Sequence, residues 1–266
     1  MIRAVRPSSL KRSGKVDMGW GIRLLRRSEL ALYWHMLQLP KVIGHRGAAA
    51  YAPENTLASF REARKRGAAW VEIDVKLTAD GVPIAMHDDS LKRTTGVDRL
   101  VAQTLRADLP ASVPTFEEAI ACFGELGLGC NVEIKPCAGR ETETARAAVE
   151  TLRRCWPTHL PPPLLSSFKD ASLAAAREAA PEFARAILIG EYGADWRMRA
   201  DAVGATAVNT NGEKLTAPWC CEIKQAGFPL GVYTINDPAV ACALFGMGVD
   251  CVITDAPDVI LAALFA

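Results

Sequence analysis

The stretch VEIDVKLTADGVPIAMHDD, residues 71–89, combines an apolar strand that carries two acids with a turn signal and a histidine. Glu72 and Asp74 are one residue apart, so a β-strand would point both carboxylates to the same face. The chain between Asp74 and Pro83 is too short for the crossover of a dozen or more residues that joins parallel strands. The segment after the turn is therefore predicted to return antiparallel, as a β-hairpin.

The turn of this hairpin is predicted at Asp80-Gly81, because both positions of a favoured two-residue hairpin turn need positive φ. The resulting register would place His87 opposite Asp74, and directly opposed residues have Cβ atoms about 5 Å apart. We therefore expect the hairpin to fold the imidazole of His87 back over both acids.

Outward from this hairpin, short apolar or β-branched runs alternate with segments that suit amphipathic helices. Such runs are found at residues 42–46, 70–75, 131–136, 164–168, 186–190, 207–211, 230–236 and 250–255, and the helical segments at 56–66, 116–126, 142–155, 171–180, 196–203, 217–226 and 238–246. Eight strands separated mainly by helices predict an α/β fold, a TIM (β/α)₈ barrel with a β-hairpin excursion after its second strand.

Polar side chains gather at the C-terminal ends of these runs. They are His45, Arg46, Glu72, Asp74, Glu133, Lys135, Ser166, Ser167, Asn209, Asn211, Tyr233, Asn236 and Asp255. In (β/α)₈ barrels the C-terminal rim of the strands carries the active site. The sequence therefore predicts a functional site at this rim.

Two of these acids, Glu72 and Asp74, would repel each other and raise each other's pKa unless positive charge lay between them. Their apolar neighbours in the strand would make unpaired burial costly. Glu133, at the end of the next barrel strand, supplies a third carboxylate. Ligands that are all oxygen suit Mg²⁺ or Ca²⁺, so one divalent cation is predicted at these three acids.

Two histidines fall at the same rim. Because imidazoles titrate near neutral pH, His45 and His87 could act as an acid/base pair beside the cation. Arg46 and Lys135 add fixed positive charge that suits a phosphate group. Tyr233 would lie at the rim either as an apolar wall for a small substrate or as part of the core.

Charge divides the chain into a basic N-terminal extension, residues 1–40, and a slightly acidic domain, residues 41–266. The extension holds eight Lys/Arg and two acids. We expect it to be poorly ordered, with Met36 as a possible true start, or to form a helix at 21–37 that binds a membrane surface or a partner. A nucleic-acid binder would carry basic charge on its folded part, so nucleic acid is not expected as a partner.

Compartment and membrane contact follow from two further features. No apolar run approaches the roughly 20 residues of a membrane span, so no transmembrane segment is expected. The eight cysteines include no C-x-x-C pair, which favours small buried hydrophobes in a reducing compartment and hence the cytoplasm. The oligomeric state is not indicated.

Taken together, the motifs resemble the glycerophosphodiester phosphodiesterase family. They are HRG (45–47), PENT (53–56), EIDV (72–75), HDDSLKRTT (87–95), VEIK (132–135), SSF (166–168), YTIN (233–236) and DCVITDAP (250–257). The resemblance implies a metal-dependent TIM barrel that cleaves glycerophosphodiesters to glycerol 3-phosphate and an alcohol. It also implies Glu72, Asp74 and Glu133 as metal ligands, His45 and His87 as general base and acid, and Arg46 and Lys135 on the phosphate.

Two departures from the family pattern bear on the substrate. Residues 96–113 are shorter than the insertion that relatives usually carry at this point, so any cap over the site should be small. Relatives often have Trp where this chain has Tyr233. Two alternatives therefore stand beside glycerophosphodiester hydrolysis: lysophospholipase D-type action on lysophospholipids, and a non-catalytic barrel that binds phosphodiesters.

Overall fold

The fold is seen in a computed structural model that describes residues 39–264. The greater part of the predicted N-terminal extension, including the helix considered at 21–37, lies outside the described residues and stays a prediction. In the described part of the chain, no helix has the length and apolar character needed to cross a membrane.

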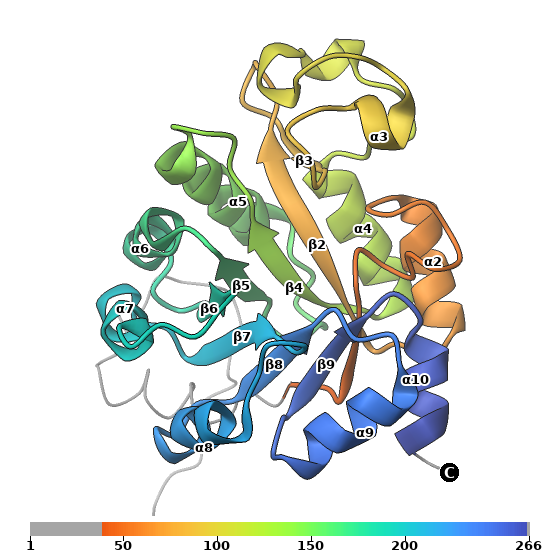
Figure 1. Ribbon diagram of the computed structural model, residues 1–266. Helices are drawn as coiled ribbons and strands as arrows, with labels where there is room; N and C mark the ends of the chain where they lie inside the picture. Colours follow the sequence, from red (N-terminus) through yellow and green to blue (C-terminus); the bar gives the residue numbers. More distant parts are fainter. Residues whose placement is uncertain (1–38, 265–266) are drawn as a thin grey trace, which may run out of the picture.

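Within residues 39–264, eight parallel strands close into a barrel, because β1 pairs with both β9 and β2. The barrel strands are β1 (Val42–Gly44), β2 (Trp70–Leu77), β4 (Gly129–Ile134), β5 (Leu164–Ser167), β6 (Ala184–Ile189), β7 (Ala207–Asn211), β8 (Leu230–Tyr233) and β9 (Cys251–Thr254). Helices lie around the outside of the strands (Figure 1). The predicted TIM barrel is confirmed.

The helices between the strands follow their sequence signals. They are α2 (Leu57–Lys65), α4 (Phe116–Leu126), α5 (Glu141–Cys155), α6 (Asp170–Ala179), α7 (Trp196–Val203), α8 (Ala217–Gln225), α9 (Pro238–Gly246) and α10 (Pro257–Leu264). Thr56 caps the start of α2, and Thr115 forms a reciprocal capping box with Glu118 at the start of α4. All seven predicted helices are present to within one residue at each end, whereas α10 was not predicted.

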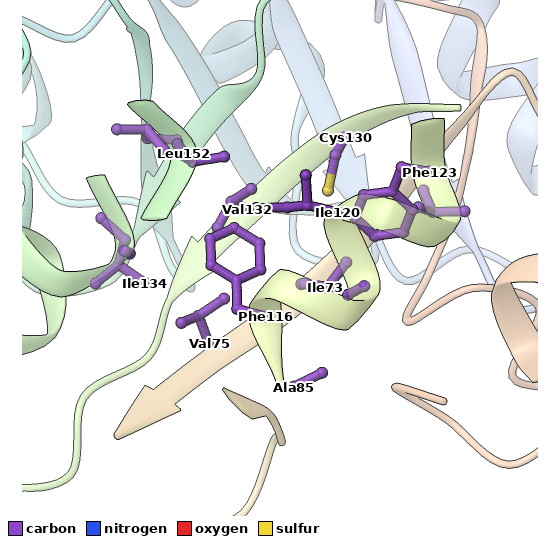
Figure 2. Packing of buried hydrophobic residues seen from close by; sticks show 14 of the residues in the cluster. Ile73, Val75, Ala85, Phe116, Ile120, Phe123, Cys130, Val132, Ile134 and Leu152 are labelled. Atoms are coloured by element: carbon purple, nitrogen blue, oxygen red, sulfur yellow. The ribbon is translucent and has the colours of Figure 1, made fainter. Parts of the chain in front are cut away.

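The two faces of β2 have different surroundings, because successive side chains of a strand point to opposite sides. Val71, Ile73 and Val75 are fully buried in a cluster that includes Phe116 and Ile120 of α4. Figure 2 shows these α4 side chains lying over β2 and β4. The intervening acids of β2 therefore point away from the helices, into the barrel.

Apolar side chains fill the barrel interior toward the N-terminal ends of the strands. Trp70, the first residue of β2, belongs to an inner cluster with Ile43 and Ile253 and pairs in register with Gly129 of β4. A methyl group at Gly129 would overlap the Trp70 indole ring. The glycine makes room for this plug, so the polar end of the barrel begins above it.

The hairpin after β2 is present, but its predicted register is wrong by one residue. β3 (Pro83–Ala85) pairs antiparallel with β2 so that Val75 faces Ala85, and the Met86 N–H donates to the Asp74 carbonyl at 2.9 Å. The loop has three residues, 79–81, because Thr78 pairs with Val82. The Thr78 N–H donates to the Val82 carbonyl at 3.1 Å, and the Val82 N–H donates to the side-chain Oγ1 of Thr78 at 2.9 Å. Met86 rather than His87 therefore lies opposite Asp74.

A small cap, residues 88–113, follows β3 and stands beyond the C-terminal end of β2 (Figure 1). It contains the short helices α3 (Lys92–Thr95), η1 (Val101–Gln103) and η2 (Arg106–Asp108). Its side chains Leu91, Val101, Leu109 and Val113 pack in one apolar cluster with Ile84, Met86 and Cys137, which lie outside the cap. The cap is thus a packed element, and it is small, as expected.

The eight cysteines are all unpaired thiols. Those at 122, 130, 137, 220 and 251 are buried. This agrees with the prediction that most of them act as small apolar side chains.

Candidate active site

Three carboxylates meet at the polar end of the barrel interior. Glu72 and Asp74 lie on β2, and Asp74 pairs in register with Glu133 of β4. One oxygen from each of the three acids lies within 4.8 Å of the others. The structure therefore brings together the acids that were predicted to form a cation site.

Burial and mutual repulsion set the pKa values of these acids. Burial, followed by the charges of Asp74 and Glu133, raises the pKa of Glu72 well above its ordinary value. Burial and the charge of Asp74 raise the pKa of Glu133 to about 7. Burial acts in the same direction on Asp74, but the cations of Lys135 and Arg46 outweigh it and lower the pKa of that carboxyl.

Two oxygens of this acid cluster fit a metal ion. Glu72 Oε1 and Asp74 Oδ1 are buried and receive no hydrogen bond from the described residues. Lys135 Nζ is 3.4 Å from Asp74 Oδ1 and 3.0 Å from Glu133 Oε1. A buried anionic oxygen without a donor is costly, and a hard divalent cation is the partner that oxygen-only ligands accept. The donor set at Glu72, Asp74 and Glu133 therefore suits a divalent cation.

Arg46 connects the loop after β1 to the acids. Its backbone N–H donates to Glu72 Oε2 at 3.0 Å, and its Nε lies 3.1 Å from Asp74 Oδ2. Its φ of 50° is unusual for a residue with a side chain, and such backbone strain is typical of functional sites. The guanidinium is thereby held at the edge of the acid cluster. Its predicted contact with a phosphate group requires such a position.

Asn55 also contacts the acid cluster, and this contact was not predicted from the sequence. Its Nδ2 donates to Asp74 Oδ2 at 2.9 Å, and the Asp74 N–H donates to its Oδ1 at 3.2 Å. Its φ of 55° is one that Asn adopts more readily than most residues. The available signal was the motif PENT, in which Asn immediately precedes the capping Thr56.

The imidazole of His45 lies between two carboxylates. Its Nδ1 is 2.7 Å from Asp255 Oδ1, and its Nε2 is 4.0 Å from Glu72 Oε2. Asn236 Nδ2 donates to Asp255 Oδ2 at 2.7 Å and holds that carboxylate in place. Asp255 follows β9, so a residue that the sequence placed only at the rim orients the predicted catalytic histidine.

The imidazole of His87 has a carboxylate partner of its own. Its Nδ1 is 2.6 Å from Asp88 Oδ1. Burial lowers the pKa of His87, while the nearby charge of Asp74 acts in the opposite direction. The charges of Lys135 and Arg46 also act on the pKa of His87, so the ring lies within range of the charges around the acid cluster, but among the described residues it makes no ion pair with the three acids. Asp88, next to His87 in the motif HDD, was not recognised as its partner.

Two aromatic side chains, Tyr233 and Phe168, also lie at this rim. Tyr233 meets Phe168 edge to face, with ring centroids 5.9 Å apart, and its hydroxyl donates to the Ile189 carbonyl at 3.1 Å. Lys135 Nζ lies 5.8 Å from the centroid of the Phe168 ring. Phe168 is 41% exposed, so this aromatic pair presents apolar surface beside the cation site.

The chain is similar to known phosphodiesterases along most of its length. The sequence profile of the "Glycerophosphoryl diester phosphodiesterase family" matches residues 45–259. YhdW of Bacillus subtilis is 30% identical over 243 residues, covering 83% of this chain and 96% of that protein.

Solved structures agree with this similarity. A phosphodiesterase of Oleispira antarctica, solved in complex with the product sn-glycerol-3-phosphate, superimposes with a TM-score of 0.83 at 38% identity, over 86% of this chain and 98% of that one. A glycerophosphodiester phosphodiesterase of Thermotoga maritima gives a TM-score of 0.70 at 27% identity, over 83% and 96% of the two chains.

Proposed function

The chain belongs to the glycerophosphoryl diester phosphodiesterase family, and on that premise we propose that it hydrolyses glycerophosphodiesters to glycerol 3-phosphate and an alcohol with one divalent cation. The complex of the Oleispira antarctica relative with sn-glycerol-3-phosphate supports this choice of product. One observation carries the proposal: a buried cluster of three acids lies 4.0 Å from the imidazole of His45 and near enough to the imidazole of His87 for the charge of Asp74 to act on its pKa, and each ring has an aspartate partner.

Glu72, Asp74 and Glu133 would hold the cation, Mg²⁺ or Ca²⁺, through carboxylate oxygens. When bound, such a cation acts as a Lewis acid toward the phosphoryl oxygens and offsets charge that develops in the transition state. Asn55 contributes by fixing the orientation of the Asp74 carboxylate through two hydrogen bonds.

The two imidazoles would move the protons of the reaction. With Nδ1–H donated to Asp255 or to Asp88, each ring would have Nε2 free for proton transfer, and Nε2 of His45 lies 4.0 Å from Glu72. One Nε2 would remove the proton from the attacking oxygen, which belongs either to water or to a glycerol hydroxyl; in the second case a cyclic phosphodiester forms, and water must then open it to give glycerol 3-phosphate. The other ring donates a proton to the departing alkoxide, so that both rings change protonation state during one cleavage.

Two side chains would bind the phosphate and two more would surround the substrate. Arg46 and Lys135 carry fixed positive charge at the edge of the acid cluster, where phosphate oxygens would meet them. Tyr233 and Phe168 would provide an apolar wall for the carbon atoms of the substrate. We also propose the cytoplasm as the compartment, with support from the eight unpaired cysteines.

A substrate panel tests the proposal. The full chain is assayed with glycerophosphocholine, glycerophosphoethanolamine and glycerophosphoglycerol, with Mg²⁺, Ca²⁺ or EDTA, and glycerol 3-phosphate is detected with its dehydrogenase. We expect cation-dependent release of glycerol 3-phosphate that EDTA abolishes. Lysophosphatidylcholine is the parallel substrate, and its preferential cleavage would favour lysophospholipase D-type action. Tight cation binding with no turnover of any substrate would favour the non-catalytic barrel.

A further inference from the structure

An arginine of the cap joins two carboxylates from different parts of the barrel mouth. Nη1 and Nη2 of Arg93, in α3, donate to Glu54 Oε2 and Oε1 at 2.8 and 2.7 Å. Its Nε and Nη2 donate to Asp88 Oδ2 and Oδ1 at 2.6 and 3.1 Å. Glu54 lies in the loop between β1 and α2, whereas Asp88 follows β3. One guanidinium therefore makes a two-pronged contact with each segment.

Each of these carboxylates also holds a residue of the proposed catalytic machinery. Arg46 Nη1 donates to Glu54 Oε1 at 2.9 Å. On the other side, Asp88 Oδ1 is 2.6 Å from His87 Nδ1. Arg93 thus binds both Glu54, which holds the guanidinium of Arg46, and Asp88, which holds the imidazole of His87.

Charges alternate in sign along this chain of contacts. The bound carboxylates raise the pKa of Arg93. Arg93 is in turn the main cause that holds the pKa of Asp88 far below its ordinary value. Isolated ion pairs at a surface contribute little to stability, but two-pronged arginine pairs that form a network are the exception. The geometry is therefore more specific than a chance surface contact.

We propose that Arg93 and Glu54 are positioning residues that fix the imidazole of His87 relative to the guanidinium of Arg46, so that proton transfer and phosphate binding act on the same phosphodiester. This inference rests on the proposed function, because it assigns a task to residues around that active site. An arginine is needed at position 93, since its guanidinium makes two hydrogen bonds to each of the two carboxylates, and the three N–H donors of a lysine ammonium cannot supply all four.

The simplest competing explanation is that Arg93 only ties the cap to the barrel. The cap, however, is already held by its apolar cluster. It is also held by Lys76 Nζ, which is nearly buried and donates to Asp89 Oδ1 at 2.6 Å and to the Lys135 carbonyl at 3.1 Å. Loss of the Arg93 contacts should therefore leave the cap folded while the two functional groups lose their fixed separation.

The test compares Arg93→Lys, Glu54→Gln and the double variant with the wild-type chain at saturating cation. Displacements of about 1 Å can reduce a rate by about a hundredfold. We expect Arg93→Lys to lower kcat at least about tenfold. We also expect it to weaken binding of glycerol 3-phosphate, measured by calorimetry, about fivefold with an unchanged unfolding midpoint. Arg99→Lys is the matched control, because Arg99 lies in the same cap and its nearest carboxylate, Asp108, is 3.9 Å away.

Non-additivity supplies the second measurement. If Glu54 and Arg93 act as one unit, the double variant should lose no more than the worse of the two single variants. Arg93→Lys kinetics and product binding within twofold of wild type, or losses that multiply in the double variant, would overturn the inference. Should Arg93→Lys fail to fold, Glu54→Gln decides by the same criteria. An inactive wild type would refute the proposed function instead, and product binding would still report on the positioning.

Discussion

Asn55, in the loop between β1 and α2, and Asp74, on the neighbouring strand β2, bind each other through two reciprocal hydrogen bonds. The side-chain Nδ2 of Asn55 donates to Asp74 Oδ2, and the Asp74 backbone N–H donates to the side-chain Oδ1 of Asn55, at 2.9 and 3.2 Å. This pairing uses one carboxylate oxygen and leaves the other, Oδ1, without a hydrogen bond. The loop before α2 thereby decides which oxygen of Asp74 faces the cation site.

Replacement of Asn55 by Gly tests this role, because Gly tolerates the φ of 55° and removes only the side-chain contacts. Partners of metal ligands typically change metal affinity by about 10–100-fold. We expect Asn55→Gly to weaken Mg²⁺ or Ca²⁺ binding by at least about tenfold in calorimetry. Wild-type affinity in a folded Asn55→Gly variant would show that Asp74 is oriented by other contacts.

Cation binding should depend on pH through Glu133. Burial and Asp74 raise its pKa from 4.5 to about 7, so between these values the folded, cation-free chain holds a proton that the unfolded chain has lost. The contribution of Glu133 to stability is therefore present below pH 4.5 and lost as the pH rises through 7. A cation needs the ionised carboxylate, so its affinity should rise from pH 6 to pH 8.

Calorimetry at these two pH values, in buffers of different ionisation enthalpy, checks the coupling. We expect more proton release on cation binding at pH 6 than at pH 8, because Glu133 is largely protonated only at the lower pH; Glu72, whose pKa is raised as well, can add to the release at both. Equal affinity at both pH values, with no proton released, would contradict the raised pKa of Glu133.

The two histidines should be required for turnover but not for folding. We expect His45→Ala and His87→Ala each to lower kcat by at least about a hundredfold, the usual contribution of a general acid or base. Circular dichroism and cation binding should stay close to wild type. Near-normal turnover in either variant would remove that imidazole from the proposed pair.

Asp255 should act through His45. Its Oδ1 is 2.7 Å from His45 Nδ1, so Asp255→Asn keeps the shape but no longer stabilises the ring tautomer that presents Nε2 or the protonated ring. We expect kcat to fall by about 10²–10⁴-fold with a smaller change in KM. Asp258→Asn is a matched control nearby on the chain, because Asp258 pairs with Arg66 at 2.7 Å instead. Equal effects of both substitutions would argue against a specific role for Asp255.

One methyl group added at Gly129 should markedly lower the stability of the fold, because Gly129 packs against Trp70 of the apolar cluster inside the barrel. Gly129→Ala would overlap the Trp70 indole ring and should lower the free energy of unfolding by about 1–3 kcal/mol, as overpacking commonly does. Gly246→Ala is the control, because an added Cβ there meets no atom within 4 Å. Denaturant unfolding of both variants measures the difference.

Much of the fold could be predicted from the sequence because its signals are local. The strand that carries Glu72 and Asp74 has an apolar residue at every second position from Val71 to Leu77, and Thr56 and Thr115 mark helix starts at short range. The hairpin register could not be predicted, because the turn depends on side chains. Thr78 Oγ1 accepts from the Val82 N–H, and Asp80 Oδ1 accepts from the Arg106 N–H, which is 26 residues away in sequence.

The site was predicted where motif residues themselves face the barrel interior, as the three acids do. The residues that orient them were missed because their contacts join distant parts of the chain. Asp255 meets His45 across 210 positions, and Asn55 meets Asp74 across 19. A periodic sequence pattern does not reveal such long-range pairs. The motifs PENT and HDD included Asn55 and Asp88 but did not show which residues they contact.

Strand β3 pairs with β2 and, among the described residues, takes no part in the closed ring of eight parallel strands. Replacement or lengthening of the cap that follows β3 should therefore leave the barrel closed and its three acids in place. A protein engineer could graft a different lid between Gly96 and Leu109, provided that His87, Asp88 and Arg93 are kept, and so change which alcohols enter without rebuilding the chemistry beneath.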